Sequence, residues 1–323
     1  MAAAPTVVPP VEVDVLIVGG GPAGLSAALT LGRSRRRVLI VDDGAPRNAP
    51  AAAMHAFLTR DGTAPEQLLA LGREEVARYG VRHRNAQATT ASNSEGRLLV
   101  GLDDGGSVSA RQLVVTTGLV DELPDVDGLT ERWGRDVVHC PYCHGWEVRD
   151  QTIGVLATSP MALHQAGLFR QLSDRVVVLR HTADGLDTDR LATLAARDVE
   201  VVDGEVVAVE VDADRLTGVR LAGGHVVALD ALAVASRVTV RSELLAGLGI
   251  VAVEHPSGMG LHVPADPMGR TEVARVWVAG NVTDPSAQVI AAAAQGNRVG
   301  ALVNAELVTE DETRAMAQMS QDA

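Results

Sequence analysis

A glycine-rich turn between two apolar runs constrains the fold of this chain more than any other feature. Residues 13–18 have the mostly apolar character of a buried parallel strand, and they lead directly into Gly19-Gly-Gly-Pro-Ala-Gly24. In a Gly-x-Gly-x-x-Gly turn the backbone approaches a pyrophosphate closely, and the pyrophosphate sits on the N-terminus of the following helix, here 22–32. A second apolar run, 38–41, ends at Asp42, where an acidic residue binds a ribose hydroxyl. The pattern predicts a dinucleotide-binding βαβ unit.

The only two cysteines of the chain, Cys140 and Cys143, form a Cys-x-x-Cys pair. If Cys140 opens a helix with Pro141 at its first position, Cys143 lies one turn further on, and the two sulfurs are close enough to form a small disulfide. The helix N-terminus favours the thiolate. His144, beside the inner cysteine, is a natural proton acceptor near neutral pH. The stretch therefore predicts a redox-active pair with a base next to it.

Two other readings of the cysteine pair fit less well. A zinc site would have to use His139 and His144 together with the cysteines, but adjacent residues rarely point at one ion, and the chain has no second Cys-x-x-Cys. A structural disulfide is disfavoured because two cysteines in 323 residues, with no secretory signal, indicate a reducing compartment. We therefore expect no metal and a cytoplasmic location.

Composition limits the classes of partner. The chain has 323 residues with 46% hydrophobic content, enough for two cores, and no internal repeat beyond two weakly similar βαβ-like halves. Its net charge of −13 excludes nucleic acid and anionic membranes as expected partners, because both would be repelled. No apolar run reaches membrane-spanning length. Residues 1–5 lack a basic region and are expected to be a short disordered lead rather than a targeting peptide.

The segment between 44 and 62 is too rich in Pro, Asn and Gly for a core element, and a loop of this length is often functional. A helix predicted over 65–79 and a buried strand over 113–118 complete the first part of the domain, 1–120. The candidates in this loop to lie along a cofactor are Arg47, Asn48 and His55.

An acidic loop after Gly118 marks the crossing into a second domain, 121–238, which carries the cysteine pair. Its strand at 151–156 and the helix predicted over 161–172 form another βαβ-like unit. The turn between them, Ala157-Thr-Ser-Pro-Met-Ala162, has no glycine where a nucleotide turn needs them, and 180–183 offers no basic cluster for a 2′-phosphate. We predict a Rossmann-like domain with a degenerate nucleotide motif.

The last part of the chain, 239–323, is expected to return to the first domain. An apolar run ends at Gly280-Asn281, and Pro285 opens a long Ala-rich helix whose dipole would meet the same cofactor from the other side. The predicted fold class is α/β, with two Rossmann-like, three-layer domains of dinucleotide-binding type, the second inserted in the first.

Over nearly its full length the chain resembles the low-molecular-weight thioredoxin reductases. The Gly19–Gly24 turn with Asp42 resembles the FAD-binding turn and ribose acid of that family, Cys140-Pro-Tyr-Cys143 its redox pair, and Gly280-Asn281 with Gln288 and Val289 the segment that cradles the ribityl chain and flavin. The resemblance implies FAD, a homodimer, an inner Cys143 that faces the flavin and an outer Cys140 that meets substrate. The implied cofactor-binding residues are Gly19, Gly20, Gly21, Pro22, Ala23, Gly24, Asp42, Asp43, Arg47, Asn48, His55, Ala88, Thr117, Gly118, Gly280, Asn281, Ala287, Gln288 and Val289.

The departures from that family indicate a subfamily. His144 stands where an acidic neighbour is usual, Asn281 stands where Asp is usual, and the glycines and arginines for NADPH are missing. This combination resembles the flavin-dependent dithiol oxidases of natural-product (antibiotic) biosynthesis, of gliotoxin and holomycin type. It implies that a small-molecule dithiol, deprotonated with help from His144, attacks Cys140 and leaves as a cyclic disulfide. The electrons then pass through Cys143 and FAD to O2, giving H2O2.

Three alternatives stay open at this point. A thioredoxin reductase-type enzyme fed by NADPH would need an unusual dinucleotide site, and one fed by ferredoxin would not need such a site at all. A flavin-bearing redox sensor, which is not an enzyme, would use the same disulfide as a switch. Turnover separates the sensor from an oxidase.

Overall fold

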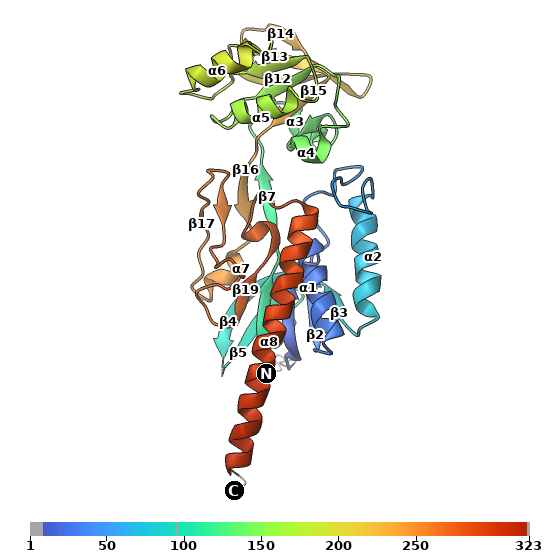
Figure 1. The fold of residues 1–323 in the computed structure, drawn as a ribbon, viewed down its shortest axis with the longest axis vertical. Helices are drawn as coiled ribbons and strands as arrows, with labels where there is room; N and C mark the ends of the chain where they lie inside the picture. Colours follow the sequence, from blue (N-terminus) through green and yellow to red (C-terminus); the bar gives the residue numbers. More distant parts are fainter. Residues whose placement is uncertain (1–8, 95, 322–323) are drawn as a thin grey trace, which may run out of the picture. The chain divides into compact units, whose positions relative to one another are not determined.

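The computed structural model describes residues 9–94 and 96–321, and the chain divides into two compact units (Figure 1). Unit 1 comprises the residues up to Arg47, Glu66–Val120 and the residues from Val238 onward; unit 2 comprises Asn48–Pro65 and Asp121–Arg237. The predicted lead, 1–5, lies outside the described residues. The segment 48–65, which we assigned from the sequence to the first domain, groups instead with unit 2.

A seven-stranded, mostly parallel sheet forms the centre of unit 1, in the order β3-β2-β1-β6-β5-β4, with β19 also paired to β6. Its β1 pairs in parallel with β2 and with β6, while β5 pairs antiparallel with β4 and β6. The strands are β1 (Val11–Val18), β2 (Val38–Asp42), β3 (Arg82–Asn85), β4 (Ala88–Ser94), β5 (Arg97–Leu102), β6 (Ser107–Val115) and β19 (Val276–Val278).

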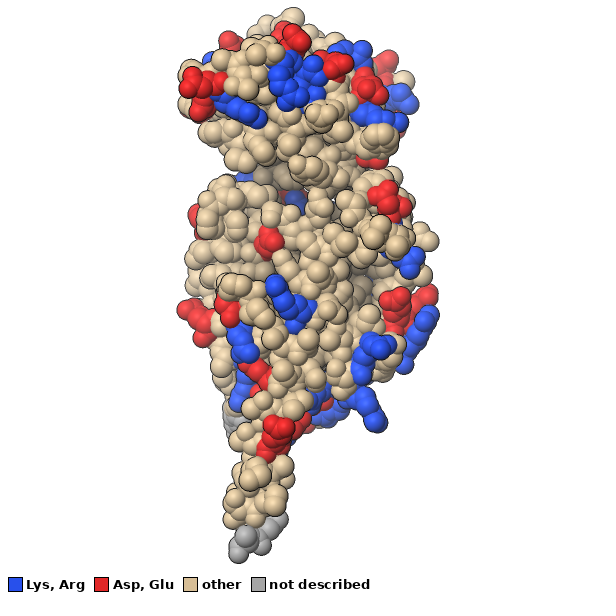
Figure 2. Space-filling view, in the orientation of Figure 1, with Lys and Arg blue, Asp and Glu red and all other residues tan. Residues whose placement is uncertain are grey.

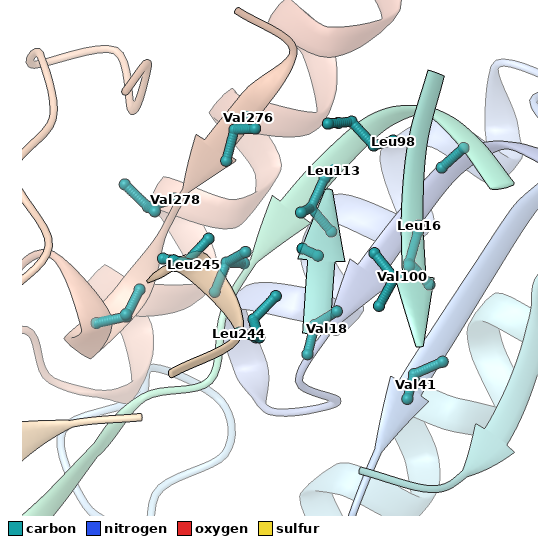
Figure 3. Close-up of a cluster of buried hydrophobic side chains, with 14 of the residues drawn as sticks. Leu16, Val18, Val41, Leu98, Val100, Leu113, Leu244, Leu245, Val276 and Val278 are labelled. Carbon is teal, nitrogen blue, oxygen red and sulfur yellow. The ribbon is translucent and has the colours of Figure 1, made fainter. Parts of the chain in front are cut away.

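Both faces of this sheet are buried, which explains why β1 reads as an almost continuous apolar run. Val15 and Ile17 pack on the face covered by the helices α1 and α8, while Leu16 and Val18 belong to the opposite cluster with Leu244 (Figure 3). The helices of unit 1 are α1 (Pro22–Arg33), α2 (Pro65–Ala77), α7 (Glu243–Ala246) and α8 (Val289–Gln321), with a 3₁₀ turn, η1, over Gly280–Val282.

Small residues let α8 pack closely against α1. A Cβ at Gly296 would meet the backbone of Ala23, and one at Gly300 would meet the backbone of Ala27. The buried positions of α8 end at Leu307, while Figure 1 shows the helix continuing beyond the sheet. Because the two helices run parallel, α8 continues past the C-terminal end of α1, where Arg36 bonds Asn304 and Asp311.

Two further sheets have two short strands each. Strands β7 (Leu119–Glu122) and β16 (Arg237–Val240), which carry the chain out of unit 1 and back, pair with each other. Strands β17 (Val253–Glu254) and β18 (Leu261–His262) form an antiparallel hairpin.

Unit 2 has its own five-stranded parallel sheet, in the order β11-β10-β9-β15-β8, and a three-stranded antiparallel sheet, β12-β13-β14. The helix α5 packs on the parallel sheet, where Phe169 and Leu163 are fully or almost fully buried. The elements are α3 (Leu129–Arg132), β8 (Val137–Val138), α4 (Pro141–His144), β9 (Ile153–Leu156), α5 (Ala162–Phe169), β10 (Val176–Leu179), α6 (Thr188–Ala195), β11 (Glu200–Val202), β12 (Val206–Asp212), β13 (Arg215–Leu221), β14 (Val226–Ala228) and β15 (Ala231–Val234).

The predicted fold class is therefore correct, with parallel-sheet α/β architecture in both units. Acidic and basic side chains of the described residues are interspersed on the face drawn in Figure 2. Within residues 9–94 and 96–321, no helix combines the length and the apolar character needed to cross a bilayer.

Candidate cofactor site and redox centre

The first glycine turn of unit 1 joins the end of β1 to α1 and is tightly packed. Gly19 has φ +106°, and a Cβ there would collide with the carbonyl of Thr116, so the position needs glycine. The Thr116 hydroxyl donates to the carbonyl of Gly19 (2.7 Å) and so pins the turn to the end of β6. Thr116 was missed in the sequence, because its contact with the turn spans almost 100 positions.

The other side of this turn is open. A Cβ built on Gly21 meets nothing within 4 Å, whereas one on Gly24 would collide with the backbone of Gly19. No protein acceptor lies within bonding distance of the Ala23 and Gly24 N–H groups in the part of the chain that the structure describes. These amides and the α1 dipole form the cradle that a pyrophosphate requires.

Asp42 stands at the end of β2, beside the same turn. Its carboxylate accepts from the N–H of Gly20 (2.5 Å) and from that of Gly44 (2.9 Å). These bonds hold the side chain at the C-terminal edge of the sheet, where a dinucleotide ribose lies. Binding of the FAD ribose by Asp42 stays a prediction, and this position of the carboxylate suits it.

Two further predicted residues, Asp43 and Thr117, contact Arg241, which sequence reasoning missed. Asp43 pairs with the Arg241 guanidinium (3.2 Å), and the Thr117 hydroxyl donates to the Arg241 carbonyl (3.1 Å). Gly118 has φ +69° and open space around its Cβ position, while Ala88 opens β4. Arg241 follows β16, far from the motif in sequence, so no local pattern indicated it.

The second glycine turn meets the first one. A Cβ on Gly280 would lie 2.9 Å from the Cβ of Ala23, so η1 approaches the N-terminus of α1 directly. The Gly280 N–H donates to Gln295 Oε1 (2.8 Å), and Gln295 in turn donates to Asp284 (3.0 Å). Gln295 and Asp284 are further residues that the sequence did not single out. The two turns converge as predicted.

Asn281 builds the loop after this turn. Its side-chain amide donates to the carbonyls of Asp284 (3.0 Å) and Ala287 (2.9 Å). Because these bonds hold 284–287 as a turn, α8 begins at Val289, four residues later than the helix start predicted at Pro285. Ala287, Gln288 and Val289 thus lie at and just before the helix N-terminus.

Replacing Gly21 with valine is expected to empty the cofactor site without disturbing the fold. Gly21 has φ −74°, which valine adopts readily, and the added methyl groups would occupy only the space in which a pyrophosphate sits. The ratio of flavin absorbance to protein in purified Gly21→Val should fall to near zero, with unchanged far-ultraviolet circular dichroism. Gly223→Val, another glycine with open space around it, is the matched control. A full flavin load in Gly21→Val would contradict this view of the turn.

The corresponding turn of unit 2, between β9 and α5, is closed. The N–H groups of Ala162, Leu163 and His164 donate to the carbonyls of the residues three positions earlier, at 3.1, 3.3 and 3.0 Å. The Thr158 hydroxyl donates to the Ala235 carbonyl (3.2 Å), which joins the chain after β9 to the chain after β15. Met161 and Ala162 stand here at the positions of Ala23 and Gly24 in the first turn, and the Ala162 N–H is already bonded within the turn, which has no glycine.

A single arginine follows β10, where a 2′-phosphate would be bound. Arg180 forms an ion pair with Asp203 (3.2 Å). His181, its neighbour, accepts from the N–H of Val206 (3.1 Å). Both side chains therefore have partners within unit 2.

The redox pair lies in unit 2, on the one-turn helix α4. Cys140 is the N-cap, Pro141 follows it, and Cys140 and Cys143 form a disulfide with their Cα atoms 5.2 Å apart. The N–H groups of Cys143 and His144 both donate to the Cys140 carbonyl (3.1 and 3.0 Å). Both cysteines are half-buried. The predicted helix and pairing are therefore present.

Gln165 of α5 holds the backbone just before the disulfide. Its Nε2 donates to the carbonyl of His139 (2.5 Å), and the His139 ring contacts the Val234 carbonyl through Nδ1 (3.0 Å). Gln165 is buried, at 8% exposure. A buried glutamine on an otherwise apolar helix face was the signal that could have identified it. Among the described residues, no group of three or more His, Cys, Asp or Glu side chains is arranged to hold a metal ion.

His144 follows Cys143 directly and is partly buried. Its Nε2 has no hydrogen-bond partner among the described residues. Burial lowers the pKa of His144 below its ordinary value; the charge of Glu147 acts in the opposite direction, and His55 and His139 lower the pKa further. The lowered pKa favours the neutral imidazole, the form in which a ring nitrogen can accept a proton, and the unpaired Nε2 is shielded from solvent in this structure.

The three candidates from the loop at 44–62 do not all belong to the same unit. Arg47 is the last residue of its part of unit 1, while Asn48 and His55 belong to unit 2. The His55 ring faces Asp61 (3.4 Å) and Glu147 (3.3 Å), and Glu147 follows the redox pair by four residues. The structure thus groups His55 with the surroundings of the disulfide.

Comparison with known proteins agrees with this geometry. The model of the family "Pyridine nucleotide-disulphide oxidoreductase" matches residues 13–296. "Thioredoxin reductase sirT" of Leptosphaeria maculans is 30% identical over 318 residues, which cover 92% of this chain and 95% of that protein. "Thioredoxin reductase tcpT" of Claviceps purpurea (strain 20.1) is 37% identical over 187 residues, 54% of this chain and only 57% of the length of that relative.

A solved structure extends the likeness to almost the whole chain. The crystal structure of HlmI has a TM-score of 0.90 and 44% identity, covering 96% of this chain and 97% of its own. These matches confirm the resemblance to thioredoxin reductase-like flavoproteins, those of gliotoxin and holomycin type included. The chain belongs to the pyridine nucleotide-disulphide oxidoreductase family and is a thioredoxin reductase-like flavoprotein whose cofactor is FAD.

Proposed function

We propose that this flavoprotein is a dithiol oxidase. In the proposed reaction a small-molecule dithiol and O2 give an intramolecular disulfide and H2O2. The observation that carries the proposal is the contrast between the two βα turns. The turn in unit 1 is an open phosphate cradle, whereas the α5 amides and the Thr158 hydroxyl of unit 2 are already bonded within the protein. We infer that the electrons enter through the thiol pair and not from a nicotinamide.

The exchange begins at the outer cysteine. A substrate thiolate attacks the sulfur of Cys140, the Cys140–Cys143 bond breaks, and Cys143 leaves as a thiolate. The second substrate thiol then attacks the mixed disulfide, so that the substrate departs as a cyclic disulfide and the enzyme pair is a dithiol. We assign His144 as the acceptor of the substrate proton, because its free, neutral ring nitrogen lies beside the pair.

When bound, FAD supplies a two-electron acceptor that O2 can reoxidise. The residues proposed to hold it are those of the two glycine turns with Asp42 and its neighbours. The role of Cys143 in this half-reaction is to deliver both electrons as its disulfide with Cys140 re-forms, so one O2 is consumed and one H2O2 released per product disulfide. We further propose a homodimer in the cytoplasm, in keeping with the family resemblance and with the low cysteine content.

The decisive experiment mixes the oxidised protein with each electron donor under anaerobic conditions. NADPH or NADH should leave the flavin absorbance unchanged, whereas a small molecule with two neighbouring thiols should bleach it. The proposed reason is that only a dithiol reduces the Cys140–Cys143 disulfide, which then passes the electrons to the flavin. Admission of air should restore the colour with about one H2O2 per disulfide, as a two-electron cycle requires. Stopped-flow absorbance at the flavin band and a peroxide assay measure these outcomes.

Each alternative gives a different result in the same experiment. Rapid bleaching by NADPH would return the protein to the NADPH-fed reductases and overturn the oxidase proposal. Bleaching by reduced ferredoxin, with no reaction of dithiols, would favour the ferredoxin-fed reductase. A single bleaching event with dithiol and no turnover in air would indicate a redox sensor.

A further inference from the structure

The hairpin of β17 and β18 is bonded on two sides to other parts of unit 1. On one side the N–H of Val238, in β16, donates to the carbonyl of Met259 (2.9 Å). On the other side the N–H of Val263 donates to the carbonyl of Val282 in η1 (2.8 Å), and both of these valines are fully buried. The hairpin thus joins the strand that brings the chain back into unit 1 to the second glycine turn.

His262, the last residue of β18, adds a side-chain bond to the same turn. Its Nδ1 lies 3.1 Å from the carbonyl oxygen of Thr283, the residue that caps η1. A carbonyl oxygen can only accept, so Nδ1 carries the proton and donates. Together with the Val263 N–H, this donor holds the carbonyls of two successive residues of the turn.

The His262 ring is itself packed against His255. The two imidazoles meet edge to face, with their ring centroids 4.8 Å apart and an angle of 84° between their planes. The N–H of Ser257 donates to Nδ1 of His255 (3.2 Å), and the backbone N–H of His255 donates to the carbonyl of Gly260 (2.7 Å). Because the ring and the backbone of His255 are both bonded within the hairpin, the surface that it presents to His262 is held in place.

Bonds inside the segment 280–287 set the shape of the turn. The Asn281 amide, for example, donates to the carbonyls of Asp284 and Ala287 (3.0 and 2.9 Å). Such bonds do not fix where the turn stands in unit 1, because donor and acceptor move together. Its place is set by bonds from outside the segment, which come from Gln295 of α8 and from the hairpin. On the hairpin, His262 supplies the side-chain donor.

The place of this turn matters because the turn approaches the first one, with the Cβ position of Gly280 2.9 Å from the Cβ of Ala23. We propose that His262 is a positioning residue for FAD, whose bond to the Thr283 carbonyl sets the spacing of the two glycine turns before the cofactor binds. The assignment rests on the prediction that both turns bind FAD. It does not depend on the electron donor or acceptor, so it applies to an oxidase and to a reductase alike.

The test compares the FAD affinity of three variants of His262. His262→Leu removes the donor, His262→Asn places an amide N–H where Nδ1 stands, and His262→Gln places it one bond further out. The dissociation constant of FAD, from equilibrium dialysis of the FAD-loaded protein, should rise about three- to tenfold in His262→Leu and His262→Gln, the scale of one neutral hydrogen bond. It should stay near the wild-type value in His262→Asn. His225→Leu, at an exposed histidine in the turn between β13 and β14, is the matched control.

Hydrogen exchange distinguishes positioning from a general loss of stability. A residue that only stabilises the fold would stabilise the FAD-free and the FAD-bound protein equally, so its removal would leave the FAD dissociation constant unchanged. In the proposed role, deuterium uptake of the FAD-loaded protein at 280–287 should rise in His262→Leu and return to the wild-type level in His262→Asn. The strands of unit 2 should keep their wild-type uptake in both variants. Neither measurement needs turnover, so the outcome is separate from that of the oxidase assay.

Two results would overturn the proposal. One is an FAD dissociation constant of His262→Leu that stays within about twofold of the wild-type value, less than one hydrogen bond contributes. The other is an equal FAD affinity of His262→Asn and His262→Gln, since a donor at the position of Nδ1 would then make no difference. Should His262→Leu fail to fold, the comparison of His262→Asn with His262→Gln decides by itself, because both variants keep a polar amide.

Discussion

Serine at either cysteine of the redox pair is expected to abolish dithiol turnover. Cys140→Ser removes the sulfur that the substrate attacks, and Cys143→Ser removes the sulfur that has to leave and later deliver electrons. No other cysteine exists in the chain to take over either role. Peroxide release with a small dithiol in air measures the loss, and both variants should keep a full load of FAD.

The two variants should differ in their spectra. Only Cys143→Ser should remove the long-wavelength absorbance of a thiolate close to the flavin in the reduced enzyme, since the inner cysteine is proposed to face the cofactor. Identical spectra in the two variants would count against distinct inner and outer roles. Disulfide formation by a Cys140→Ser/Cys143→Ser double variant, above the uncatalysed rate, would mean that substrate reaches the flavin without the pair.

Removal of the base should have the next largest effect. His144→Ala is expected to slow turnover by ~10²–10⁴, the usual scale for loss of a general base. Burial lowers the pKa of His144 from its ordinary value of 6.5, so the wild-type imidazole is still neutral at a pH somewhat below 6.5. The wild-type rate should therefore fall only when the pH drops through that lowered pKa. The variant should lack this acid limb and partly recover at alkaline pH, where substrate thiols ionise unaided.

The measurement is kcat against pH for the wild type, His144→Ala and the control His225→Ala. The control should match the wild type, because His225 is exposed in a turn of unit 2. A wild-type rate in His144→Ala at neutral pH would remove the proton-transfer role and leave His144 as a packing residue.

Local patterns predicted most of the fold, and long-range contacts account for what they missed. Gly19–Gly24 and Asp42 were identifiable because strand, turn, helix and strand follow one another directly, and their bounds agree with the predicted ones to within two residues. The sequence predicts a start of α8 that is too early, at Pro285. Helix propensity does not account for the bonds from the Asn281 amide to the carbonyls of Asp284 and Ala287, which hold the preceding turn.

Long-range contacts around the two sites were likewise not predicted from local sequence patterns. Thr116 and Gln295 bond the glycine turns, and Arg241 pairs with Asp43, but none of the three belongs to a local motif with its partner. His55 pairs with Glu147, which is 92 residues away in the sequence. Because no local pattern indicates this pairing, the sequence alone suggested that the loop at 44–62 lies along the cofactor. Sequence reasoning predicted which side chains carry chemistry, and the structure shows which of them stand together.

The closed turn before α5 bears on how this branch of the family could change again. Three successive backbone amides there are bonded to carbonyls of the residues just before them, so the block lies in the main chain and not in any one side chain. A point substitution that restores a glycine leaves those amides occupied. Under the proposed function, use of a nicotinamide would therefore require changes at several backbone positions of this turn, which one glycine substitution does not supply.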